Sequence, residues 1–136
     1  MTPKLHRILN SPRWIRQDIK DLESELEAYR QTMLVQGISY DSDKVQTSPK
    51  DRMPEYAARV DGILGKIKER QHAYLKAHDR IIRITKKLKP EERSIIIQQY
   101  LEGKRYEDIA ASFPMSERQM FRYRKSAIEK LDKRCQ

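Results

Sequence analysis

Apolar residues recur in alternating steps of three and four along two long segments of the chain. In the first segment these positions are Ile15, Ile19, Leu22, Leu26, Tyr29 and Met33. In the second segment the same steps continue, but three of the positions, Gln71, His78 and Thr85, are polar. The full series is Val60, Leu64, Ile67, Gln71, Tyr74, His78, Ile81, Thr85 and Leu88. This spacing is the heptad seam of a coiled coil. It predicts two long helices that pack either within one chain or between two copies.

The expected ends of the first helix come from Ser, Pro and Gly. Ser11 is expected to cap it, and Pro12 suits its first turn. Gly37 is expected to end the seam, and residues 37–54 combine two prolines with Ser and Asp without any apolar period. We therefore predict a loop over 37–54, long enough for the first helix to fold back as an antiparallel hairpin.

Three shorter helices are expected after Lys89. Pro90 opens the first and Gly103 stops it; the second runs from Tyr106 to about Phe113, and the third follows Ser116. The last has an apolar stripe made of Met120, Tyr123, Ala127, Ile128 and Leu131. We thus predict an all-α chain, with a helical hairpin or coiled coil over 1–89 and a helix-turn-helix domain over 90–136.

Residues 106–127 meet the physical requirements of a helix-turn-helix. The small side chain of Ala110 allows a close helix crossing, and Ser116 can cap the second helix after a tight connection. Opposite the apolar stripe project Arg118, Gln119, Phe121, Arg122 and Lys125. Long donors on such a face can reach base edges or phosphates.

Composition and charge narrow the class of partner. The chain has 136 residues, of which 38% are apolar and 36% charged, with a formal net charge of +9. That length excludes a large enzyme fold, and that charge favours an anionic partner such as nucleic acid. Residues 63–89 hold nine basic and two acidic side chains, a net of +7, and residues 104–136 hold nine and five, a net of +4. Only in residues 104–136 does the positive charge coincide with the predicted helix-turn-helix.

The sequence offers no catalytic or cofactor chemistry. No phosphate-binding glycine loop, paired metal carboxylates or nucleophile with a base is recognisable, so we expect neither an enzyme nor a cofactor. Cys135 is the single cysteine, which precludes an internal disulfide. No apolar run approaches the roughly 20 residues of a membrane span, and we expect no contact with a membrane. We expect a soluble, cytosolic protein.

The C-terminal part resembles a known family. The segment LKPEERSIIIQQYLEGKRYEDIAASFPMSERQMFRYRKSAIEKL is similar to region 4 of bacterial sigma factors. With the N-terminal helical pair and the phrase SDKVQTSPKDRM, the whole chain resembles small phage-encoded regulators of the ArpU/RinA type. The resemblance implies a regulator that activates late phage genes in the cytoplasm of a bacterial host cell. Its implied partner is double-stranded DNA, with host RNA polymerase as a second candidate partner.

The same resemblance assigns candidate DNA-binding residues. The groove-facing positions fall on Glu117, Arg118, Phe121 and Arg122, flanked by Gln119 and Lys125, with Ser116 as the cap. Arg83, Lys86 and Lys87 adjoin this module and are expected to touch the DNA backbone. Two residues depart from the family pattern, namely Pro114 in the turn and Phe121. Phe121 either contacts a thymine methyl group or packs on a neighbouring helix.

The leading hypothesis is a phage or prophage transcriptional regulator, with N-terminal helices that dimerise or recruit polymerase. One alternative is a phage packaging protein resembling a terminase small subunit, which forms a large ring. Another is a sigma-like adaptor that binds polymerase without contacting DNA. Solution mass and duplex binding discriminate among the three.

Overall fold

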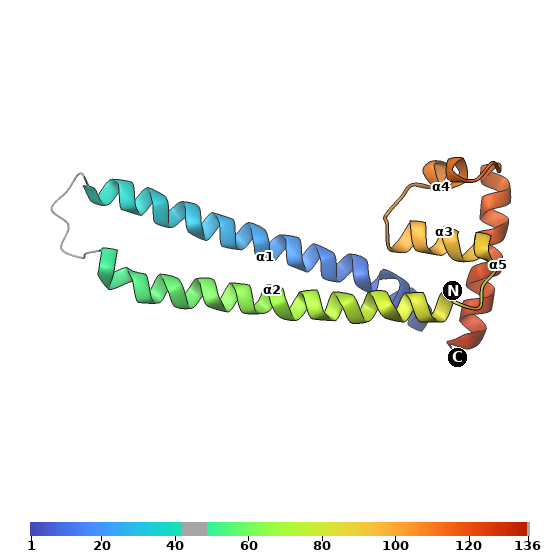
Figure 1. Cartoon of the computed structure of the whole chain (residues 1–136), viewed down its shortest axis with the longest axis horizontal. Coiled ribbons are helices and arrows are strands. Elements are labelled where there is room, and N and C mark those ends of the chain that lie inside the picture. Colours follow the sequence, from blue (N-terminus) through green and yellow to red (C-terminus); the bar gives the residue numbers. More distant parts are fainter. Residues whose placement is uncertain (42–48, 136) are drawn as a thin grey trace. The chain divides into compact units, whose positions relative to one another are not determined.

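The structure, a computed structural model, describes residues 1–41 and 49–135, with side chains over 1–34 and 53–135. This part of the chain is all-helical, as expected (Figure 1). The helices are α1 (Pro3–Asp41), α2 (Pro49–Thr85), α3 (Pro90–Tyr100), α4 (Tyr106–Ser112) and α5 (Glu117–Arg134). No helix among these residues is long and apolar enough to cross a membrane.

Two compact units divide the chain. Unit 1 combines residues 1–15 with residues 73–136, and unit 2 comprises residues 16–72. Both α1 and α2 contribute to both units. The units divide after residues 15 and 72, not at the expected boundary between residues 89 and 90. The reason is that the start of the chain belongs to the same unit as the C-terminal helices.

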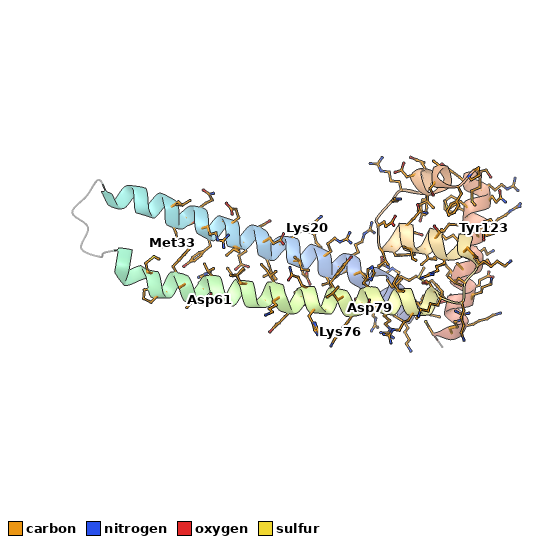
Figure 2. The ribbon with its side chains drawn as sticks, viewed as in Figure 1. Lys20, Met33, Asp61, Lys76, Asp79 and Tyr123 are labelled. Carbon is orange, nitrogen blue, oxygen red and sulfur yellow. The ribbon has the colours of Figure 1, made fainter. Side chains whose placement is uncertain are left out.

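Unit 2 is a pair of helical segments from α1 and α2. Leu26 of α1 and Ile63 and Ile67 of α2 are buried together, and Ile19, Leu22 and Val60 pack around them. Farther along, the rings of Tyr29 and Tyr56 stack with centroids 5.3 Å apart. The first seam is confirmed, since all six of its residues, including Met33 (Figure 2), are at least half-buried.

The second seam is correct only in part. Ile63 is 4% exposed, whereas Leu64 is 43% exposed and Gln71 is exposed as well. The steps from Val60 to Ile67 can be taken as three then four or as four then three, and both satisfy the heptad spacing. The structure takes the first, which places an isoleucine in the seam and leaves Leu64 outside it.

The expected start of the first helix is wrong. Helix α1 begins at Pro3, where the Thr2 hydroxyl accepts a hydrogen bond of 3.3 Å from the backbone N–H of Leu5. Pro12 lies inside the helix and is buried. An interior proline costs about 3 kcal/mol. Burial of Leu5, Ile8 and Leu9, each 7% exposed or less, offsets that cost. These three residues precede the heptad pattern, which therefore did not predict their burial.

The predicted loop over 37–54 is also wrong at both ends. Helix α1 continues through Gly37 to Asp41, and α2 already begins at Pro49 and contains Pro54. One interior glycine costs a helix only about 1 kcal/mol, and a proline is well tolerated at a first helical position. The rest of the expected loop, residues 42–48, lies outside the described residues.

Unit 1 has a core assembled from both ends of the chain. Leu5, Ile8 and Leu9 of α1 are buried with residues of α2, α3 and α5 and of the connections after α2 and α3, namely Ile81, Leu88, Ile96, Leu101, Ala127, Ile128 and Leu131. Within this unit α5 packs against both α3 and α4 (Figure 1). Helix α3 ends before Gly103, whose φ of 67° is the left-handed conformation that favours glycine. The unit thus fixes α5 along most of its length.

Candidate nucleic-acid interface

A short extended connection joins α4 to α5. Phe113 and Ser116 both have extended backbone conformations, with ψ of 146° and 158°. The Ser116 hydroxyl accepts a hydrogen bond of 3.2 Å from the backbone N–H of Gln119, so its expected role as N-cap is confirmed. Pro114 lies between these two residues, where it neither extends α4 nor interrupts α5.

A small apolar cluster holds α4 against α5. Ile95 of α3, Ile109 and Ala110 of α4 and Met120 of α5 are buried together, at 5% exposure or less. Phe113, Met115 and Tyr123 pack around them. The predicted inward residues of α4 and α5 therefore meet in one cluster, which fixes which face of α5 points away from the protein.

The outward face of α5 carries the predicted site residues. All of the following are exposed: Ser116, Glu117, Arg118, Gln119, Phe121, Arg122 and Lys125. Arg118, Arg122 and Lys125 are spaced by four and three residues, which places them on one side of the helix. No hydrogen bond or ion pair within the described residues engages the side chains of these three. Three cations are thus presented in a row on a firmly packed helix.

Phe121 packs on a neighbouring helix, which is one of the two alternatives from the sequence. Its ring lies 4.8 Å from that of Tyr106 in α4, at an interplanar angle of 55°. Both rings remain about two-fifths exposed, at 42% and 40%. The pair links the first turn of α4 to the second turn of α5, and sequence reasoning did not anticipate the part of Tyr106 in it.

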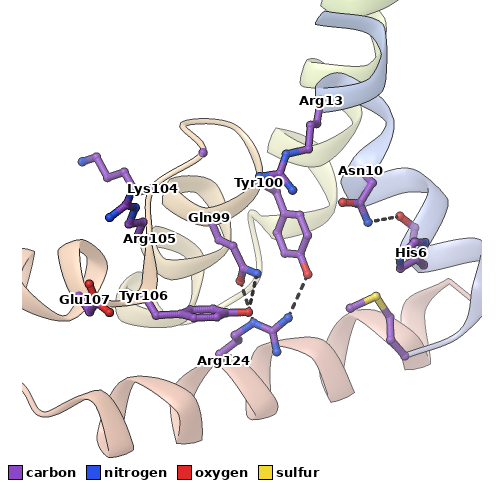
Figure 3. A pocket seen from close by; sticks show the side chains of 12 residues that line it. His6, Asn10, Arg13, Gln99, Tyr100, Lys104, Arg105, Tyr106, Glu107 and Arg124 are labelled. Atoms are coloured by element: carbon purple, nitrogen blue, oxygen red, sulfur yellow. Dashed lines mark hydrogen bonds between the residues drawn. The ribbon is translucent and has the colours of Figure 1, made fainter. Parts of the chain in front are cut away.

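Arg124 belongs to the scaffold of this site. Its guanidinium donates to the Gln99 side-chain oxygen at 2.7 Å and to the Tyr100 hydroxyl at 3.1 Å, in a pocket of about 620 Å³ (Figure 3). Arg124 follows Met120 by four residues and precedes Ala127 by three, so it lies on the inward stripe. That spacing is the signal that separates it from the exposed arginines of α5.

An ion pair between a buried carboxylate and a partly exposed lysine ties α5 to α3. Glu92 is 1% exposed, and both of its carboxylate oxygens accept hydrogen bonds from the Lys130 ammonium, at 2.8 and 3.1 Å. The Ser126 hydroxyl donates to the same carboxylate at 3.4 Å. From the sequence Glu92 is only an acidic residue in a first helical turn. Its position three and four residues before Ile95 and Ile96, both fully buried, is the sign that it faces the core.

The structure does not bring Arg83, Lys86 and Lys87 together with the outward face of α5. All three are exposed around the end of α2. The neighbouring carbonyl of Ile84 accepts a hydrogen bond of 3.1 Å from Arg134, the last residue of α5. At about 1.5 Å per residue, that end lies roughly 26 Å along α5 from Ser116. These three cations and the row on α5 therefore form separate groups within unit 1.

Comparison with known proteins does not assign this chain to a family. No protein-family model matches the chain, and no curated protein or solved structure matches it either.

Proposed function

We propose that this chain is a sequence-specific duplex-DNA-binding regulator of the phage or prophage type, in which α4 and α5 act as a helix-turn-helix. One observation carries the proposal. Arg118, Arg122 and Lys125 form an unpaired cationic row on the outward side of α5, while the opposite side of that helix is anchored in the core. A protruding helix of this kind fits the major groove of B-DNA.

The residue types on this face suit two kinds of contact. Arginine donates in a bidentate manner to the O6 and N7 atoms of guanine, and glutamine can pair with adenine in the same groove. Arg118, Gln119 and Arg122 therefore supply base reading. Lys125 lies two turns into α5 and supplies a phosphate contact.

The helical pair of unit 2 is assigned to protein contact. Its seam is filled by Leu26, Ile63 and Ile67, which hold its two helical segments together. We propose that it serves a second copy of this chain or host RNA polymerase, so that DNA binding by α5 leads to activation of late genes.

Duplex affinity measured against salt concentration tests the proposal. The logarithm of the association constant should fall with the logarithm of salt concentration by about 0.9 per neutralised phosphate. Arg118→Ala and Arg122→Ala should each lose about 1–3 kcal/mol of preference for sites selected from random duplex over scrambled sites. Arg30→Ala, at an exposed arginine of unit 2, is the matched control and should bind like the unchanged protein.

Two outcomes would favour the alternative functions instead. A ring of eight or more subunits in solution would indicate a packaging protein. Capture of RNA polymerase without any duplex binding would indicate a sigma-like adaptor. Either result would contradict the proposed regulator.

A further inference from the structure

Unit 1 contains a second cationic surface, away from the outward face of α5. Two adjoining hollows lie where the first residues of α1 meet the last turns of α2, and both are lined by Arg7, Ile8 and Arg80. Lys4 lines one of them and Lys76 the other. We call this continuous surface the basic groove. It has four cationic side chains and no acidic residue in its lining.

The four cations of the basic groove have no partners among the residues that the structure describes. Lys4, Arg7, Lys76 and Arg80 are all exposed, and none makes a hydrogen bond or an ion pair. Figure 2 labels the adjacent acid on α2, Asp79. Its carboxylate lies 3.8 Å from the imidazole of His78. No acidic side chain in the lining offsets the mutual repulsion of these four charges. Such a surface attracts a polyanion.

The spacing of the cations gives the groove a direction. Lys76, Arg80 and Arg83 succeed each other by four and three residues, so they form one row along α2. The row spans about 10 Å and leads towards Lys86 and Lys87 at the end of the helix. A row of flexible cations matches a line of phosphates better than it matches a single compact anion.

The basic groove lies at the far end of α5 from its capped start. Cys135, which follows the last residue of α5, lines one of the two hollows. The length of α5 places this end about 26 Å from Ser116 along the helix axis. That separation is shorter than one turn of B-DNA, which is about 34 Å.

We propose that the basic groove binds the phosphate backbone of duplex DNA that flanks the site read by α5. This inference rests on the proposed function and extends the DNA footprint beyond one recognition helix. The chemistry of the lining favours DNA over a membrane, because its one large apolar side chain, Ile8, is 7% exposed and offers nothing to insert.

The experiment compares two duplexes that share a selected site. One is about 12 base pairs long and covers only the contact of α5, and the other is about 30 base pairs long. The double substitution Arg7→Ala/Arg80→Ala should weaken binding to the long duplex about tenfold and reduce the salt slope by about two. Binding to the short duplex and the preference for the selected site should not change.

Matched variants keep the outcome interpretable. Lys20→Ala/Lys68→Ala removes two exposed charges from unit 2 and should bind both duplexes like the unchanged protein. Lys4→Gln/Lys76→Gln removes the other two charges of the basic groove and should repeat the loss on the long duplex. Thermal melting followed by circular dichroism should show that the groove variants are at least as stable as the parent, since they relieve repulsion.

Several results would overturn the inference. If the parent binds both duplexes but the groove variants bind the long one equally well, the inference fails and the proposed function stands. If the groove variants lose site preference as Arg118→Ala does, the groove reads bases and the backbone assignment is wrong. If the groove variants lose binding to anionic vesicles or an acidic peptide but keep duplex affinity, the occupant is not DNA. If the parent binds no duplex, both proposals fail together.

Discussion

Asp132 links the first residues of the chain to the last helix. Its carboxylate accepts hydrogen bonds from the backbone N–H of Thr2 at 2.9 Å and from the Thr2 hydroxyl at 3.1 Å. The backbone donor of Thr2 is the main reason that the pKa of Asp132 lies below its ordinary value, and it outweighs the opposing effect of desolvation. The ionised form of this side chain therefore stabilises the folded state.

The pH dependence of stability should show this contribution. Because the pKa is lower in the folded state, the stabilisation is present above about pH 4, the ordinary value for aspartate, and is lost as the pH falls through the folded value. Asp132→Asn should lower the free energy of unfolding by about 1 kcal/mol at pH 7 and by less at pH 3, measured by urea denaturation. Glu129→Gln, at an exposed position of α5, should cost little at either pH. An equal loss for Asp132→Asn at both pH values would contradict the prediction.

At the scale of an element, α5 depends on how it begins. The Ser116 hydroxyl satisfies the backbone N–H of Gln119, and the outward arginines follow within the next two turns. Fraying of this end would disorder the residues proposed to read bases. The cap is therefore part of the proposed interface as well as of the fold.

Removal of the cap should weaken folding and DNA binding together. Ser116→Ala should cost about 1 kcal/mol of stability in thermal melts and should weaken duplex binding. Ser116→Asp keeps a capping oxygen and places a negative charge at the positive end of the helix dipole, so it should retain the parent's stability. A loss of stability in the Asp variant as large as that in the Ala variant would show that the cap is not the cause.

Sequence patterns predicted those elements whose information is local. The cap at Ser116, the buried stripe of α5 and the first seam depend on spacings within one helix, and all three agree with the structure. The choice between Ile63 and Leu64 could not be made, because two registers satisfy the same period. The continuation of α1 through Pro12 could not be predicted either, since it depends on residues more than 60 positions away that bury Leu5 and Leu9. The spacing of Arg124 and Glu92 places both on inward stripes, but their partners Gln99 and Lys130 come from other helices and could not be predicted.

At the scale of the whole molecule, unit 1 is made from two separated pieces of chain. Residues 1–15 add Leu5, Ile8 and Leu9 to the core that holds α5 through Ala127 and Leu131. The C-terminal helices therefore share one core with the start of the chain. A mutation near the N-terminus should consequently be felt in the proposed DNA-binding helix.

Leu9→Ala tests this coupling. Leu9 is fully buried, so the substitution should cost about 2–5 kcal/mol and should raise the hydrogen-exchange rates of backbone amides in α5. Leu64→Ala removes the same atoms from a side chain that is 43% exposed, and it should leave α5 protected. Unchanged exchange in α5 of the Leu9 variant would show that the N-terminal residues are not part of a cooperative core.

The split composition of unit 1 also bears on how the protein is made. Ribosomes release the chain from its N-terminus, and residues 16–72 of unit 2 are contiguous, so this helical pair can form while synthesis continues. Leu5, Ile8 and Leu9 share their core with Ile128 and Leu131, which are synthesised more than 115 positions later. The apolar segment over residues 5–9 therefore lacks part of its core until α5 has been made. It is the segment of the nascent chain that we expect a chaperone to bind.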